Sequence, residues 1–564
     1  MYLRRTQRRT KDGGAVGYLQ LAHNVWDRES RQSRVRVIHS FGREDQLDRT
    51  AIVRLIGSLQ RVLEPGQALE ATADTQLRFT ESRPMGGALM LDGLWRRLGI
   101  HTVMSGLLEG RRLDGAAERV LFALVANRAL EPLSKLAATG WVRERAWIDG
   151  LDDVTDDACY RAMDWLLEIE EQLCERVYWQ TADLLNLEVD LLFFDTTSTY
   201  FETDRADDPA VDENGDVTPG FRAYGHSKDH RPDLPQVRIG MAVTRTGIPI
   251  RVWCWPGNQS EQELIRQVKD DLREWKLSRV VWVADRGFQS AENRRYLQRC
   301  GGHYIIGEKL RGESKEAAAA LARQGRYRTV TGNLQIKEVV LDDGTMRDRF
   351  VICRNPEQAE RDQHVRDELL AQLQAQIAGS DKLTPDERAN LHARVKTKRG
   401  LARFLRTTAS GLLRIDRAAV NAEAHLDGKY LLRSSDPTLS AEDIALGYKQ
   451  LLQVERGWRD LKTTLDLRPV HHRREDRIRA HVLLCWLALL LIRIIEHETT
   501  DTWRNVRNEL QRLHLGTFTG PAGTCQHRTE LTTRQRDLLR TLKLPEPGRF
   551  TRLDPAPAPA AQAT

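Results

Sequence analysis

The chain has 564 residues, too many for one compact core, so we expect two to four domains. Its content of 40% hydrophobic and 29% charged residues is typical of a soluble globular protein and excludes a largely disordered one. The net charge of +6 arises from 86 basic and 80 acidic side chains, which allows a basic face for nucleic acid beside a separate acidic pocket.

The seven cysteines lie far apart and include no CxxC pair, which argues against zinc ribbons and disulfide frameworks and favours a reducing cytoplasm. The N-terminal MYLRRTQRRT has no apolar run behind its basic residues, so we do not expect a signal peptide. The longest apolar stretch, residues 482–495, is shorter than the roughly 20 residues of a membrane span and contains Arg493. It predicts a buried helix.

Residues 1–45 are rich in Arg and Lys, and the segments GYLQLAHNVW and SRVRVIHSFG alternate apolar and polar residues as half-buried strands do. They predict a small basic β-hairpin unit, which either contacts DNA or caps the protein. From residue 46 to 185 apolar residues recur at three- and four-residue spacing. This pattern predicts a helical region, in which either a helix-turn-helix for binding DNA ends or a plain bundle is possible.

Residues 186–305 predict an α/β core with buried central strands. The strand-like runs are VDLLFFDTTSTYFE, QVRIGMAVTRTGIPIRVWCWPG and SRVVWVADRGF, with helical ELIRQVKDDLREW before the last. Residues 306–435 interrupt this order as an insertion that is first β-rich and then helical. Residues 436–500 are helical again and begin with an expected cap at Ser440. Residues 501–564 form a C-terminal region whose Pro/Ala-rich tail is expected to be disordered.

Two aspartates follow apolar strand patterns. Asp195 ends the run VDLLFFD, and Asp285 ends VVWVAD just before a Gly that permits a tight turn. Each aspartate alone could simply cap a turn through backbone amides. Because ligands gather outside the carboxyl ends of strands in open α/β sheets, the pair together indicates a site.

A third acidic residue, Glu455, lies on a predicted helix. Tyr448, Glu455 and Lys462 follow one another at seven-residue spacing and so share one helical face. An exposed face with an ion pair from Glu455 to Arg459 is the alternative. Two Asp and one Glu from separate elements suit two magnesium ions, which prefer oxygen ligands and can act together in phosphodiester chemistry.

These motifs resemble those of a known family. FFDTTSTYFE, VVWVADRGF and YKQLLQVERGWRDLK are similar to the three acidic motifs of bacterial insertion-sequence DDE transposases. The branch that looks most similar is the insertion-sequence-four group and its relatives, which carry a β-rich insertion before the Glu. GHSKDHRPDLPQ also resembles a segment that these proteins carry after the first Asp. The resemblance covers roughly residues 185–500.

The resemblance implies a ribonuclease-H-like catalytic core, interrupted by the insertion, that moves a DNA element by cut-and-paste. Asp195, Asp285 and Glu455 take the catalytic positions and hold two Mg²⁺ ions, for which Mn²⁺ can substitute. The expected partners are terminal inverted repeats, target DNA and a second copy of the chain in a synaptic complex, with no membrane. The expected location is the cytoplasm, on the nucleoid.

In this group a Tyr, an Arg and a Lys around the Glu hold the terminal phosphate. Tyr448 and Lys462 match the pattern, whereas Leu451 replaces the Arg. The resemblance therefore assigns Tyr448 and Lys462 to DNA, with Arg456 or Arg459 covering part of the loss.

Further basic residues flank the motifs. In GHSKDHRPD, we expect Lys228 and Arg231 to contact DNA phosphate and Asp229 and Asp233 to order the loop. The basic run HHRR includes Arg473 and Arg474, which either contact phosphate or are simply solvated.

Two other functions share much of this pattern. A nuclease with the same fold would cut DNA without joining it, and a decayed relative would bind DNA without cutting it. The helix motif and the long insertion favour a transposase over the nuclease, and the complete carboxylate triad argues against the inactive relative.

Overall fold

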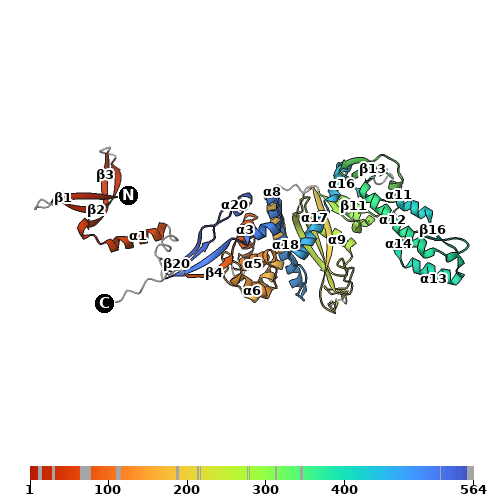
Figure 1. Ribbon diagram of the computed structural model, residues 1–564, viewed down its shortest axis with the longest axis horizontal. Helices are drawn as coiled ribbons and strands as arrows, with labels where there is room; N and C mark the ends of the chain where they lie inside the picture. The colour runs from red at the N-terminus through yellow and green to blue at the C-terminus, as the bar shows by residue number, and fades with distance from the viewer. Residues whose placement is uncertain are drawn as a thin grey trace. The chain divides into compact units, whose positions relative to one another are not determined.

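The computed structural model describes residues 1–9, 15–27, 32–63, 78–109, 116–185, 190–211, 215, 217–275, 277, 280–311, 314–342, 347–520 and 523–555 (Figure 1). The chain forms two compact units. The terminal unit contains Met1–Arg83, Leu513–Leu531 and Pro547–Thr564, and the central unit contains Pro84–Arg512 and Thr532–Glu546. The tail from residue 556 onward, which we expect to be disordered, lies outside the described residues.

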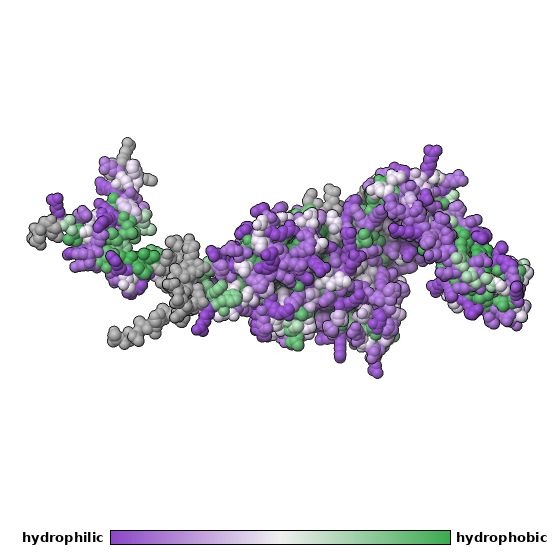
Figure 2. Space-filling view, in the orientation of Figure 1, coloured by the Kyte–Doolittle hydropathy of each residue, from purple (hydrophilic) through white to green (hydrophobic). Residues whose placement is uncertain are grey.

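The terminal unit begins with an antiparallel sheet of β1 (Tyr2–Arg9), β2 (Ala15–Asp27) and β3 (Gln32–Arg43). The predicted β2–β3 hairpin is confirmed, and β1 extends it. Its apolar side chains are more open than the half-buried pattern predicts, since Val35 is 41% and Ile38 is 50% exposed. Figure 2 shows this apolar surface among the hydrophilic side chains of the sheet.

A 3₁₀ turn, η1 (Glu44–Gln46), and helix α1 (Arg49–Leu63) follow, as the helical pattern predicts. A strand then appears where a helix was expected. Strand β4 (Arg78–Pro84) joins β18 (His514–Gly520), β19 (Gly523–Arg528) and β20 (Phe550–Pro555) in a second sheet. The sequence did not reveal this strand because its partners lie more than 400 residues further along the chain.

The central unit is built on a nine-stranded mixed sheet in the order β12-β13-β14-β17-β11-β10-β5-β8-β9. Its strands are β5 (Leu191–Tyr200), β8 (Gln236–Val243), β9 (Pro249–Pro256), β10 (Val281–Ala284), β11 (His303–Glu308), β12 (Arg328–Thr331), β13 (Leu334–Asp342), β14 (Arg347–Arg354) and β17 (Lys429–Ser434). Strand β5 runs parallel to β10 and antiparallel to β8, and β10 runs parallel to β11. Apolar side chains on both faces of these strands are buried, as their nearly continuous hydrophobic runs predict.

The strands of the predicted insertion are part of this same sheet. Strand β17 pairs with β11 on one side and with β14 on the other, so β12–β14 continue the core sheet. The helical part of the insertion has a separate small core around Leu373, Val395 and Phe404. It comprises α12 (Pro356–Ile377), η4 (Ser380–Lys382), α13 (Pro385–Lys396), α14 (Arg399–Ala402), α15 (Arg417–Ala424) and the hairpin of β15 (Leu405–Thr407) and β16 (Leu413–Ile415).

Helices from both ends of the central unit pack around α18 (Glu475–Thr499). Those directly against it include α3 (Gly86–Arg97), α5 (Ala117–Leu130), α7 (Asp156–Glu168), α19 (Trp503–Leu510) and α20 (Thr533–Thr541). Next to them, α4 (Ile100–Leu108), α6 (Lys135–Glu144) and α8 (Glu170–Leu185) pack against neighbouring elements. Helix α5 is buried from Ala117 to Ala129 against α18 and α7, so it cannot serve as the recognition helix of a helix-turn-helix. In the described part of the chain, α18 alone has the length and apolarity to span a bilayer, and 89% of that apolar window is buried, as predicted.

Smaller elements complete the unit. They are β6 (Ala210–Val211), β7 (Val217–Thr218), α9 (Glu261–Arg273), η2 (Arg286–Phe288), α10 (Ala291–Gln298), η3 (Arg299–Gly301) and α11 (Lys315–Ala322). Two helices, α16 (Ala441–Lys449) and α17 (Leu452–Thr463), carry the third acidic motif.

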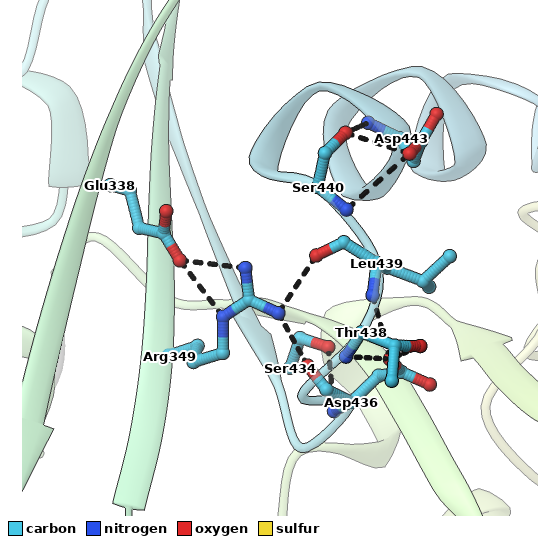
Figure 3. A network of polar contacts seen from close by, with 8 residues as sticks. All are labelled: Glu338, Arg349, Ser434, Asp436, Thr438, Leu439, Ser440 and Asp443. Atoms are coloured by element: carbon cyan, nitrogen blue, oxygen red, sulfur yellow. Dashed lines mark hydrogen bonds and ion pairs between the residues drawn. The ribbon is translucent and has the colours of Figure 1, made fainter.

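A polar network fixes the start of α16 against the sheet (Figure 3). The guanidinium of Arg349, on β14, donates to Glu338 at 2.8 Å and to the backbone carbonyls of Asp436 and Leu439. The fully buried Asp436 accepts from the amide of Leu439 at 2.9 Å, and Ser440 then caps α16 in a capping box, as predicted. This turn therefore sets the direction in which α16 leaves the sheet.

Replacement of Asp436 tests this role. Asp436→Ala removes a buried acceptor from the Leu439 amide and from both donors of Thr438. We expect it to lower the free energy of unfolding by about 1–3 kcal/mol, measured as a shift in the thermal midpoint. Asp436→Asn keeps an acceptor oxygen and should recover part of the loss; equal losses in both variants would contradict the assignment.

Candidate active site

The register of two parallel strands brings the first two acidic motifs together. Phe194 on β5 is opposite Ala284 on β10. The next residues, Asp195 within β5 and Asp285 directly after β10, therefore lie at the same level of the sheet. The prediction that Asp195 ends its strand was wrong. Strand β5 continues to Tyr200 because β8 pairs with it over that length, whereas β10 stops at Ala284 and Asp285 follows a strand end as predicted.

The helix motif is divided between two helices. Tyr448 is on α16, whereas Glu455 and Lys462 are on α17, and a turn at residues 450–451 separates them. The expectation of one continuous helical face was therefore wrong. The Tyr448 hydroxyl donates to Asp285 Oδ1 at 3.2 Å. It approaches β11 so closely that a Cβ on Gly307 would lie 2.4 Å from its oxygen, so only glycine fits there.

A pocket of about 890 Å³ contains the three predicted carboxylates. Its lining residues are Asp195, Lys228, Asp285, Arg286, Gly307, Glu308, Lys309, Leu310, Arg311, Lys429, Tyr430, Leu431, Tyr448, Lys449, Leu451, Leu452 and Glu455. Glu455 is exposed in it, and no ion pair with Arg459 occurs within the described residues. Acidic and basic side chains thus line the same pocket.

The carboxylate oxygens of Asp195, Asp285 and Glu455 are the ligand type that a hard divalent cation prefers. Within the described ranges, no group of three or more His, Cys, Asp or Glu side chains is already drawn together around one metal position. The donor set thus fits a divalent ion by the chemistry of its oxygens, and the three carboxylates line one pocket without surrounding a common position.

Comparison with known proteins identifies the family. A family model described as "Transposase DDE domain" matches residues 193–491, more than half of the chain, and its range includes all three carboxylates. The chain belongs to the DDE transposase family. Residues 3–72 match the model "IS1634 family transposase, N-terminal domain", so this is an insertion-sequence DDE transposase.

Among solved structures, a "piggyBac transposase synaptic complex with hairpin DNA" aligns with 76% of this chain and 79% of that one, at 10% identity and a TM-score of 0.34. A score at this level does not establish a shared fold. No curated protein matches the chain.

Lys228 lies between two carboxylates of the transposase. Its ammonium is 3.3 Å from Asp195 Oδ1 and 3.1 Å from Glu261 Oε1, and it donates to the Thr196 carbonyl at 2.6 Å. Burial raises the pKa of Asp195, and the charge of Lys228 offsets only part of that rise. Glu261 also binds Arg238 at 2.5 Å. Glu261 belongs to no motif in the sequence, because its position beside Asp195 depends on how α9 packs.

Asp229, the neighbour of Lys228, ties its loop to the end of α17. It forms ion pairs with Lys462 at 2.8 Å and with Arg468 at 2.9 Å, which agrees with the expected ordering role. Lys462, expected to hold phosphate, is only 12% exposed and does not line the pocket. Arg231 likewise pairs with Asp233, at 2.8 Å, outside the pocket.

The cations that line the pocket differ from the predicted set. Arg456 and Arg459 are exposed on α17 but do not line it, whereas Leu451 does. Its cations besides Lys228 are Arg286, Lys309, Arg311, Lys429 and Lys449. Two of them could have been found beside Asp285 and Tyr448 in the sequence. The others come from β11 and β17 and the residues next to them, which only the sheet order brings to the pocket.

The basic run after α17 lies at a second pocket of about 490 Å³. Its lining residues are Phe201, Glu202, Thr203, Arg205, Ala206, Arg222, Pro469, Val470, His471, His472 and Arg473. Arg474 is not among them and pairs with Asp476. Burial and the positive charges of Lys135, Arg477 and Arg128 lower the pKa of His472 to about 4.

This low pKa predicts a loss of stability in acid. Between its ordinary pKa of 6.5 and about pH 4, His472 is protonated in the unfolded chain but neutral in the folded protein. Stability should therefore be complete above pH 6.5 and decrease as the pH falls toward 4. We expect His472→Gln to flatten the dependence of the thermal midpoint between pH 7 and pH 5. The matched control is His364→Gln on α12, a 78% exposed histidine, which should behave as wild type.

Proposed function

We propose that this transposase cleaves the 3′ ends of its element and joins them to target DNA, a cut-and-paste reaction, with Asp195, Asp285 and Glu455 as the catalytic carboxylates. The observation that carries the proposal is their convergence on one pocket from β5, β10 and α17. Two Mg²⁺ ions are the proposed cofactors, and Mn²⁺ can substitute. When bound, such ions activate the attacking oxygen and stabilise the leaving 3′-oxygen.

The surrounding side chains have supporting roles in this proposal. Tyr448 holds Asp285 in orientation through its hydroxyl. Lys228 balances the charge of Asp195 and Glu261. The other cations that line the pocket, including Arg286 and Lys449, attract and position the phosphate backbone, because such contacts provide most of the affinity for DNA.

We propose that β9-β8-β5-β10-β11 is the ribonuclease-H-like core and that β12–β14 and β17 are the insertion that extends it. Numbered along the chain, the five core strands have the sheet order 3-2-1-4-5, with antiparallel pairing among the first three and parallel pairing from the first to the fourth and from the fourth to the fifth, which supports this assignment. An insertion between the second Asp and the Glu also agrees with membership of the insertion-sequence-four group and its relatives.

DNA-end recognition is assigned to the basic terminal unit. Strands β1 and β3 carry exposed arginines, which suit phosphate contacts. We propose that two copies pair two ends as a homodimer in a synaptic complex, in the cytoplasm on the nucleoid.

Removal of one carboxylate tests the catalytic assignment. Asp285→Asn or Glu455→Gln should reduce Mg²⁺-dependent 3′ nicking of a labelled DNA end by at least about 10³-fold, with end binding retained. Asp537→Asn, an exposed carboxylate on α20, is the matched control. Undiminished nicking by Glu455→Gln would disprove its role. Joined products distinguish a transposase from a nuclease, and end binding by wild type without nicking would indicate an inactive relative.

Tyr448→Phe separates two roles for the tyrosine. If it orients Asp285, loss of a hydrogen bond to a charged group should slow cleavage at saturating DNA by about 10-fold while the affinity for the ends stays unchanged. If it holds the terminal phosphate, the affinity should fall and the saturated rate should persist. Single-turnover cleavage and an equilibrium binding titration measure the two quantities.

A further inference from the structure

The second pocket, lined by residues 201–206, Arg222 and residues 469–473, is named here the second cleft. Its arginines Arg205 and Arg473 have no ion-pair partner within the described residues, and neither has the imidazole of His471. Arg222 is paired with Asp207, and Glu202 is the acidic residue of the lining. The cleft therefore presents unpaired positive charge at a concave surface.

Two buried cations lie behind its residue His472. Lys135 is 4% exposed and Arg128 is 5% exposed, and the charges of both act on His472. Neither has a carboxylate at ion-pair distance in the described part of the chain. Arg128 reaches only the backbone carbonyls of Leu465 and Asp466, at 3.5 and 3.4 Å.

This arrangement is costly without an anion. Burial, and then the charge of Arg128, lower the pKa of Lys135 to about 7, so keeping its ammonium charged carries a cost that a nearby anion would offset. Lys135 is also the first residue of α6, where the helix dipole is positive and disfavours a second positive charge. Three other buried arginines of the central unit have carboxylate partners: Arg119 with Glu118, Arg238 with Glu261, and Arg366 with Asp427. A fourth, Arg251, instead lies over the rings of Trp253 and Trp275 at 5.4 and 5.7 Å.

The second cleft is also within reach of DNA held at the catalytic pocket. Strand β5 connects them directly, and Tyr200 lies about 17 Å along it from Asp195 at the usual rise per residue. That length corresponds to about five base-pair steps of a duplex. Between the two pockets, the guanidinium groups of Arg231 and Arg468 lie over the Tyr200 ring at 5.3 and 5.6 Å.

We propose that the second cleft binds a backbone phosphate of the DNA that runs past the catalytic pocket, with Arg473, Arg205 and His471 in contact and the charges of Lys135 and Arg128 behind them. This inference rests on the proposed function, since it takes DNA as the ligand. The bound phosphate offsets the buried positive charge that the protein alone leaves uncompensated.

The test compares binding of an element-end duplex at several salt concentrations. Arg473→Ala should reduce the slope of log affinity against log salt by about 1, and Arg473→Lys should restore it. Arg540→Ala is the matched control, because that exposed arginine already pairs with Asp537 at 3.0 Å. An unchanged slope in Arg473→Ala would overturn the proposal, and this variant changes only an exposed side chain.

Lys135→Met provides an independent readout. It should raise the thermal midpoint of the free protein, by removing an uncompensated charge, and at the same time weaken DNA binding. A lower midpoint with unchanged DNA binding would show a purely structural lysine and overturn the proposal. Inorganic phosphate, compared with chloride at equal ionic strength, should stabilise wild type more than Lys135→Met.

Stabilisation by phosphate without any change of DNA binding in the variants would mean that the cleft takes free phosphate, which also overturns the DNA assignment. Wild-type nicking with Mg²⁺ is measured in parallel. Its absence counts against the proposed function, whereas the salt slopes report on the cleft alone.

Discussion

The parallel pairing of β5 with β10 is the constraint on which the site depends. It places Asp195 and Asp285 at one level of the sheet although 90 residues separate them in the sequence. A slip by one residue would direct one carboxylate to the opposite face of the sheet. The buried apolar residues that precede both aspartates hold this register, because a slip would place large side chains such as Phe193 and Phe194 where the packing on each face does not fit them. The pairing of these two strands thus determines both the packing of the core and the positions of the two carboxylates.

Charge compensation organises what surrounds the strands. Carboxylates next to the pocket receive cations from other elements, as Glu261 does from Lys228 and Arg238 and as Asp229 does from Lys462. These pairs fasten the loop after β5 to α9 and to the end of α17. Where such compensation is missing, around Lys135, the charge remains available to a ligand. A substrate of uniform negative charge suits a protein with these two kinds of region.

Much of the site could be predicted from local sequence. The apolar runs before the aspartates, the cap at Ser440 and the buried α18 depend on neighbouring residues, and the structure has them. Long-range pairing could not be read in this way. Strand β4 needs partners from the other end of the chain, and the cations Lys309 and Lys429 enter the pocket only because β17 pairs with β11. Lys462 matches the motif, but its charge is paired with Asp229, a contact that the local sequence does not show.

The second sheet of the terminal unit combines β4 with β18–β20, so the whole central unit is inserted between its strands. During synthesis the ribosome must therefore complete the central unit before that sheet can close. Glu455 emerges late as well, 260 residues after Asp195. A nascent chain shorter than 455 residues consequently lacks both a complete carboxylate set and a closed terminal unit. Contacts this distant in sequence form slowly, so closure of the terminal sheet is among the last steps of folding.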